Sequence, residues 1–104
     1  MNKRQYVVKI LPTYEADLLE TIAYIRDVLK NKTAAEKLLN ETERKIYERA
    51  YMPTNFEPYR SKKKREYVYY IIRVGNYMIF YVVIGNIMEV RRLIYRARDR
   101  ENLL

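Results

Sequence analysis

The stretch that decides the fold is Glu66–Tyr95, which reads EYVYYIIRVGNYMIFYVVIGNIMEVRRLIY. Two Gly-Asn pairs divide it into three apolar runs, and such pairs are typical of two-residue hairpin turns. The middle run is apolar throughout, which favours a central strand covered on part of both faces. We therefore predict an antiparallel meander of three strands: Glu66–Val74, Tyr77–Ile84 and Ile87–Tyr95.

Alternation along a strand sorts its side chains onto the two faces of the sheet. On the first strand, Arg73 shares a face with Tyr67, Tyr69 and Ile71. On the third strand, alternation groups Arg91 with Glu89, Leu93 and Tyr95. Arg92 should then lie on the opposite face from Arg91.

The residues before the meander predict a strand and two helices. Tyr6–Ile10 is rich in β-branched and aromatic residues, and Thr13 is a candidate N-cap for a first helix. Thr33-x-x-Glu36 has the pattern of a capping box for a second helix. Apolar residues repeat at helical spacing: Leu18, Ile22, Ile25 and Leu29 on the first helix, and Ala35, Leu38, Leu39, Thr42, Ile46 and Ala50 on the second.

Together these patterns predict one α+β domain that spans residues 1–104. A chain of 104 residues has the length of a single domain. The short break between the helices favours an antiparallel two-helix hairpin. Its apolar stripe must be buried, so we expect the hairpin, which follows the N-terminal strand, to pack on an antiparallel sheet that contains the C-terminal three-strand meander.

The composition excludes several kinds of chemistry. The sequence has no cysteine and no histidine, so a disulfide framework and the usual zinc ligands are absent. With two glycines it also has no Gly-rich phosphate loop. We therefore expect neither a metal nor a cofactor. The apolar runs are too short to span a bilayer, and we expect a cytoplasmic protein with no membrane partner.

The positive charge is concentrated in the second half of the chain. The net charge is +8, and residues 59–104 contain eleven Lys or Arg against four Asp or Glu. A one-sided positive field attracts anions and speeds their association. Nucleic acid and acidic protein segments are therefore candidate partners, while a basic surface that serves only solubility is the alternative.

Arginine and tyrosine are the candidate functional residues, because no paired carboxylates occur in this half of the chain. Arg grips phosphates and Tyr stacks on bases, a combination that suits single-stranded RNA. RNA can supply its own 2′-hydroxyl nucleophile, which the protein need only align while it stabilises the charge on phosphorus. The candidate catalytic residues are Arg73, Arg92, Tyr95 and Arg98. A protein that blocks its target by docking is the alternative.

Candidate contacts to a nucleic acid or other target lie in a basic run and near the C-terminus. They are Arg60, Lys62, Lys63, Lys64, Arg65, Arg91, Arg96 and Arg100. The run from Arg60 to Arg65 is equally consistent with a solvated loop. Arg98 and Asp99 either form a local ion pair or contact the target, and Leu103 and Leu104 are either packing anchors or frayed.

Three stretches of the chain resemble the RelE/ParE superfamily of type II toxins. They are YVVKILPTYEADL (residues 6–18), NYMIFYVV (76–83) and VRRLIYRARDRENLL (90–104). The last is the most specific, since the family ending has an aromatic residue or His, then Arg-Asp, then a terminal Leu pair. Here these are Tyr95, Arg98-Asp99 and Leu103-Leu104. The resemblance covers nearly the whole chain.

The resemblance implies a toxin that is neutralised by a cognate antitoxin, acidic where it wraps the toxin. RelE-like members cut mRNA on the ribosome as metal-independent endoribonucleases, and ParE-like members poison DNA gyrase. We expect growth inhibition by ribosome-associated mRNA cleavage, with gyrase inhibition or a non-toxic RNA-binding module as alternatives. Two features depart from the nuclease pattern: Met78 stands where an arginine is common, and the preceding strand, where Lys or Arg are usual, has only Arg73. Tyr95 stands where some members have His.

Overall fold

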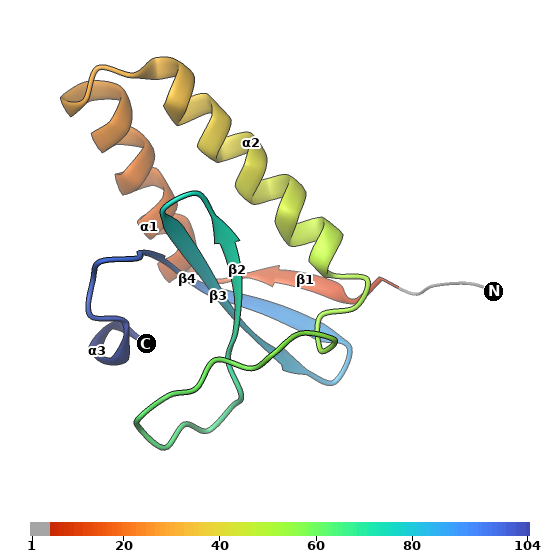
Figure 1. The fold of residues 1–104 in the computed structure, drawn as a ribbon. Coiled ribbons are helices and arrows are strands. Elements are labelled where there is room, and N and C mark those ends of the chain that lie inside the picture. The colour runs from red at the N-terminus through yellow and green to blue at the C-terminus, as the bar shows by residue number, and fades with distance from the viewer. Residues whose placement is uncertain (1–4) are drawn as a thin grey trace.

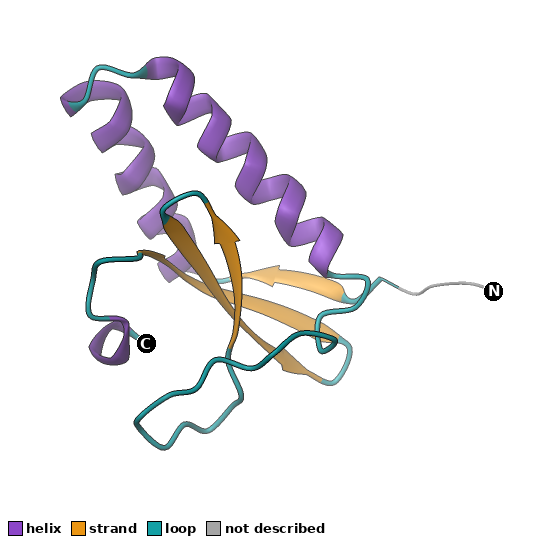
Figure 2. Cartoon of the chain, in the orientation of Figure 1, coloured by secondary structure: helices purple, strands orange, loops and turns teal. Residues whose placement is uncertain are grey.

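The computed structural model describes residues 5–104, in which a helical hairpin covers one face of a four-stranded sheet (Figures 1 and 2). A long loop and a short C-terminal helix lie against the other face. The elements in chain order are β1 (Val7–Ile10), α1 (Pro12–Ala23), the π-helical turn η1 (Tyr24–Val28), α2 (Lys32–Arg49), β2 (Tyr70–Val74), β3 (Tyr77–Ile84), β4 (Ile87–Tyr95) and α3 (Arg100–Leu103). The predicted α+β architecture is confirmed.

The sheet has the order β1-β4-β3-β2 and is mixed. The meander β2-β3-β4 is antiparallel, as predicted. β1 adds a parallel edge strand, with Val7 opposite Ile87 and Ile10 opposite Val90. Parallel pairing is possible because the long crossover through α1 and α2 separates β1 from the meander.

Glycine makes both turns of the meander possible. Gly75 and Gly85 have φ of 57° and 61°, in the left-handed region that side chains disfavour. β3 and β4 have the predicted bounds, whereas β2 begins at Tyr70 instead of Glu66. The loop takes up the preceding residues, since the Tyr59 N–H donates to the Tyr69 carbonyl at 2.8 Å.

A β-bulge in β4 changes which arginines share a face. Phe80 pairs with Arg92, but its neighbour Tyr81 pairs with Val90, so Arg91 is the extra residue. The bulge moves Leu93 to the helical side with Val90. It leaves Arg91 and Arg92 both on the opposite side of the sheet. The predicted grouping of Arg91 with Leu93 and Tyr95 was therefore wrong, and so was the predicted placement of Arg92 on the face opposite Arg91.

The helix starts also differ from the prediction. α1 begins at Pro12 after Leu11, and neither this N-cap nor Thr13 provides a side-chain cap. α2 is capped by Asn31, whose Oδ1 accepts the Ala34 N–H at 3.0 Å. Asn31 takes this role from the predicted capping box at Thr33, because its side chain satisfies a first-turn N–H from a position nearer the N-terminus.

The π-helical turn explains why the apolar stripe of the first helix ends early. A π turn has an extra residue, which rotates the next side chains relative to their directions in a regular helix. Ile25 is buried, but Leu29, which follows the turn, is 55% exposed. On the second helix, α2, Leu39 is also exposed, at 42%. The predicted inward positions of Leu29 and Leu39 were wrong, whereas the other apolar positions of both helices pack into the core.

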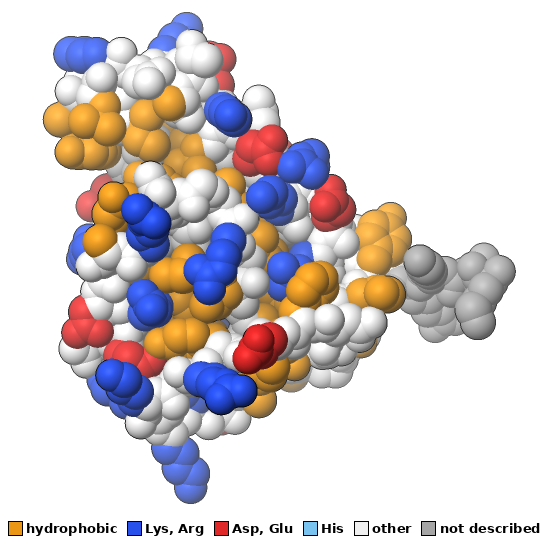
Figure 3. All heavy atoms as spheres, in the orientation of Figure 1, with side chains coloured by type: hydrophobic (Ala, Val, Ile, Leu, Met, Phe, Trp, Pro, Cys, Tyr) orange, Lys and Arg blue, Asp and Glu red, His pale blue; other side chains and the backbone are white. Residues whose placement is uncertain are grey.

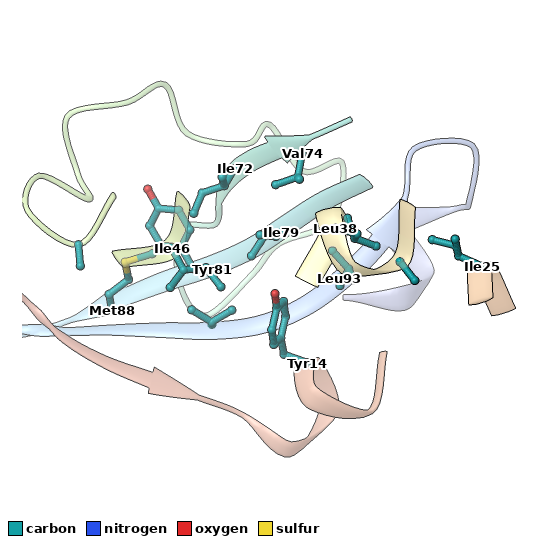
Figure 4. Packing of buried hydrophobic residues seen from close by; sticks show 13 residues of the cluster. Tyr14, Ile25, Leu38, Ile46, Ile72, Val74, Ile79, Tyr81, Met88 and Leu93 are labelled. Atoms are coloured by element: carbon teal, nitrogen blue, oxygen red, sulfur yellow. The ribbon is translucent and has the colours of Figure 1, made fainter. Parts of the chain in front are cut away.

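Two apolar clusters lie on the two faces of the sheet. Between the sheet and the helical hairpin, Ile79, Tyr81 and Met88 are fully buried (Figure 4). On the opposite face, Phe80 and Val82 are fully buried. This second cluster is completed by half-buried residues of the loop and the C-terminus, among them Tyr59, Tyr67, Leu103 and Leu104. Within residues 5–104, no helix is long and apolar enough to cross a membrane.

Tyr14 has a buried hydroxyl with no hydrogen-bond partner among the described residues. Burial raises its pKa to about 12, so the hydroxyl stays protonated. An unsatisfied buried hydroxyl destabilises the fold, and we expect Tyr14→Phe to raise the free energy of unfolding by about 1 kcal/mol. Urea unfolding measures this change. A loss of stability would show that the hydroxyl has a partner in solution.

Candidate functional site

The basic run forms a loop around a carboxylate from the end of the chain. Glu101, on α3, accepts hydrogen bonds from the Tyr59 hydroxyl, from Ser61 Oγ at 3.0 Å, and from the backbone N–H groups of Lys62 and Lys63 at 2.8 and 3.3 Å. We call residues 59–65 the basic loop. The guanidinium of Arg65 is 3.7 Å from the same carboxylate. With Arg65 included, five residues of the basic loop contribute a group that faces α3.

Two predicted contact residues of the basic loop bind the chain itself. Arg65 donates to the carbonyls of Glu101 and Leu104 at 2.7 and 3.3 Å, and Lys63 Nζ donates to Asn102 at 2.6 Å. The side chains of Lys62 and Lys64 are exposed. Arg60 is exposed too, and its guanidinium lies 3.6 Å from the Glu57 carboxylate. The run is therefore part solvated loop and part clamp on the C-terminus.

The hydrogen bonds to Glu101 fix its protonation state. The Tyr59 hydroxyl, together with the Ser61 hydroxyl and the two backbone N–H groups, lowers the pKa of Glu101 to about 2. Burial, then the bond to this carboxylate, raises the pKa of Tyr59. The pair therefore acts as a phenol donor and a carboxylate acceptor at neutral pH.

This contact predicts an acid-sensitive C-terminus. Because the pKa of Glu101 is depressed in the folded chain, its stabilisation is complete above the ordinary carboxyl value of 4.5 and is lost as the pH falls through about 2. We expect the amide resonances of Lys62 and Lys63 to shift over this window. In Glu101→Gln the same titration should be absent, and its persistence would assign the transition to another group.

Arg91 and Arg92 lie side by side in β4 but have different partners. Arg91 donates to Glu89 at 2.9 Å and to the Tyr69 hydroxyl at 3.1 Å, and its guanidinium lies 5.1 Å from the Tyr67 ring centre. Arg92 forms a bidentate pair with Asp17 of α1, at 2.7 and 3.0 Å. Both guanidinium groups are thus engaged within the fold.

Asp17 joins α1 to the bulge in β4. Its Oδ2 also accepts the Leu93 N–H at 3.0 Å, on the part of β4 that β1 does not reach. Arg92 in addition donates to the Leu103 carbonyl at 2.5 Å. One carboxylate and one guanidinium therefore connect the first helix, the sheet and the C-terminus.

The four candidate catalytic residues do not form one cluster. Arg73 is exposed on β2, with Nη1 3.4 Å from Met78 Sδ. Tyr95 packs edge-on against Tyr77, at 5.4 Å between ring centres, and so lies with the residues on the helical side. Arg98 is exposed and its side chain makes no hydrogen bond within residues 5–104. The Arg92 side chain leaves β4 on the face of Phe80, away from Tyr95, and its guanidinium is bound by Asp17 of α1.

The C-terminus is packed, which decides the alternative that the sequence left open for its last two residues. Leu103 and Leu104 are half-buried against the second cluster and act as anchors. Arg98 and Asp99 form no ion pair with each other, and Asp99 accepts from Asn102 at 2.5 Å. Arg96 is exposed, and Arg100 donates to its carbonyl at 3.3 Å.

Sequence reasoning missed the two carboxylates that organise this surface, Asp17 and Glu101. Each lies far along the chain from its partners, 75 residues in the pair of Asp17 and Arg92. No local pattern signals such contacts. For Glu101 the available signal was the scarcity of acidic residues in the second half, which makes it a candidate partner for the surrounding arginines. That signal does not extend to Asp17, which lies in the first half.

An apolar patch lies at the tip of the helical hairpin. Tyr24, Val28 and Leu29 are each more than half exposed there, and hydrophobic side chains are visible at this tip in Figure 3. Large exposed apolar groups gathered in one place are typical of protein contact sites. Lys and Arg lie over the loop, β2 and α2 on the face in view. Within residues 5–104, no group of three potential metal ligands occurs.

Comparison with known families identifies the family of the chain. A family model described as "ParE toxin of type II toxin-antitoxin system, parDE" matches residues 8–100 of the chain. No curated protein matches this chain. The matched range includes every helix and strand except the first residue of β1 and most of α3.

Proposed function

This chain belongs to the ParE toxin family of type II toxin–antitoxin systems, and on this premise we propose that it arrests growth by docking on DNA gyrase in the cytoplasm. The observation that supports docking over RNA cleavage is the separation of the candidate catalytic residues. Arg92 and Tyr95 leave β4 on opposite faces, the Arg92 guanidinium is paired with Asp17, and Arg73 lies on β2, two strands away from β4. The family implies an antitoxin partner.

Metal-free RNA cleavage needs groups that meet at one phosphate. The 2′-hydroxyl must be aligned, and donors must converge on the oxygens that gain charge. Here the Arg92 guanidinium is already paired with Asp17 and with the Leu103 carbonyl. Met78, on β3, provides no charge beside Arg73. This arrangement supports a docking toxin better than a nuclease.

Docking on a protein requires an accessible contact area that can be desolvated. Among residues 5–104, the two most exposed large apolar side chains lie on the helical hairpin: Val28 at 64% and Leu19 at 63%. Burial of such side chains is the main favourable term in protein association. We propose that the tip of the hairpin contacts gyrase, and that an acidic antitoxin segment is attracted to the positive second half of the chain.

Induction of the gene tests the target. We expect thymidine incorporation to fall before leucine incorporation, and the variant with Arg73, Tyr95 and Arg98 all replaced by alanine to arrest growth as strongly as the original chain. Early loss of leucine incorporation, abolished by the same three substitutions, would contradict the proposal and support mRNA cleavage.

A charge placed at the hairpin tip tests the docking surface. Val28→Glu puts a carboxylate in the proposed contact and should relieve growth arrest, because burying an unpaired charge is costly. Val68→Glu is the matched control, since Val68 is 57% exposed on the loop and outside the tip. Both variants should fold normally. Equal toxicity of the two would show that the tip is not the contact.

A further inference from the structure

The basic loop has the donor set of a phosphate-binding site. Four donors of this loop converge on one carboxylate. They are the hydroxyl groups of Tyr59 and Ser61 and the backbone N–H groups of Lys62 and Lys63. Consecutive N–H groups joined by a hydroxyl and a guanidinium are a recurrent arrangement around phosphate. In this structure the anion at the centre is the chain's own Glu101.

A pocket of about 320 Å³ adjoins this donor set. It is lined by four residues of the basic loop, including Ser61 and Lys63, and by Tyr67 and Tyr69. Tyrosine rings are side chains on which nucleobases stack. The pocket lining includes one acidic residue, the exposed Glu66, and two basic residues, Lys63 and Arg65.

We propose that the basic loop and this pocket form a nucleotide-binding site, with a phosphate group in the position that Glu101 occupies and the base against the tyrosines. The nucleotide is either free or part of a single strand of nucleic acid. This site is separate from the hairpin tip, so it goes beyond the docking on gyrase and does not depend on it.

The charge around the site favours a phosphate over a second carboxylate. Glu101 supplies one negative charge to a loop that contains five cationic side chains, and Lys62 and Lys64 among them are exposed. A phosphate brings more charge and a third oxygen to the same donors. An acidic peptide would match the loop but has no group for the tyrosine-lined pocket.

The tail competes with the nucleotide for the same donors. α3 is four residues long, and it is held by the Glu101 contacts, by Arg65 and by half-buried Leu103 and Leu104. Removal of the Glu101 carboxylate therefore frees the phosphate position without altering the loop's own residues. We expect Glu101→Ala to bind phosphate at least about tenfold more tightly than the original chain, because the competing anion is gone.

Amide NMR of the full chain tests the proposal with three probes: inorganic phosphate, adenosine monophosphate and a short single-stranded oligonucleotide. In Glu101→Ala, phosphate should shift the amides of Lys62 and Lys63, and adenosine monophosphate should also shift Tyr67. Tighter binding of the oligonucleotide than of the mononucleotide would identify nucleic acid as the source, and equal binding a free nucleotide. Absence of these shifts with all three probes would overturn the site.

Matched substitutions separate a built site from general charge attraction. In the Glu101→Ala background, Arg65→Ala removes a donor of the site and Lys64→Ala removes an exposed charge of the same sign. We expect only Arg65→Ala to abolish the phosphate shifts. Equal losses, or binding of a glutamate-rich peptide without phosphate binding, would overturn the proposal. Glu101→Ser, which also removes the carboxylate and shortens the side chain, repeats the test if the alanine variant fails to fold.

Discussion

Replacement of Asp17 by alanine is expected to lower the free energy of unfolding by about 3 kcal/mol, the largest effect among the substitutions considered. The Asp17 and Arg92 side chains are 18% and 25% exposed, and they meet at 2.7 Å. Removal of the carboxylate leaves a largely buried guanidinium and the Leu93 N–H without their acceptor. Denaturant unfolding measures the loss.

The cause of this loss can be separated by related variants. Asp17→Asn keeps an acceptor for the Leu93 N–H and should lose less stability than Asp17→Ala. The double variant of Asp17→Ala and Arg92→Ala should lose a different amount of stability from the sum of the two single losses, as expected for residues in direct contact. Asp27→Ala is the control, since its pair with Arg26 is exposed and should matter little. Additive losses would contradict a direct contribution from the pair.

Arg49→Ala is expected to lower the free energy of unfolding by about 2 kcal/mol. Arg49 Nη1 donates to the Tyr81 hydroxyl at 2.9 Å and to the Ile71 carbonyl at 3.1 Å. Its guanidinium lies 3.5 Å from the ring centre of Phe56. One side chain of α2 thus holds the loop and the outer edge of β2, and its loss should also increase hydrogen exchange in both.

Arg44 provides the control on the same helix. It forms short ion pairs with Glu41 and Glu48, at 2.6 and 2.8 Å, but its side chain is 54% exposed. Exposed pairs contribute little because water and salt screen them. Arg44→Ala should leave the unfolding midpoint almost unchanged. Similar losses for Arg44→Ala and Arg49→Ala would show that burial does not distinguish them.

The elements of the fold could be predicted because their signals are local. The Gly-Asn pairs define β3 and β4 to the residue, since a left-handed turn position requires glycine. Helical periodicity located the hairpin. It failed at Leu29, because no local pattern marks the π-helical turn that precedes this residue.

For the candidate functional site, the sequence predicts which residue types are present but not which of them contact one another. The sequence shows that arginines are concentrated near the C-terminus, but their partners are distant in the chain. Arg92 is neutralised by Asp17, and the basic loop is closed on Glu101. The bulge at Arg91 also moves neighbouring arginines to one side, which strict alternation cannot anticipate. Contacts between remote segments therefore decide which charges remain available.

Inhibition of purified gyrase tests the central proposal most directly. The purified chain should block supercoiling of relaxed plasmid by gyrase, and the triple variant with alanine at positions 73, 95 and 98 should block it equally. Val28→Glu should not, while Val68→Glu should. Undisturbed supercoiling, together with cleavage of mRNA on ribosomes that the triple substitution abolishes, would contradict docking on gyrase and identify the chain as a nuclease.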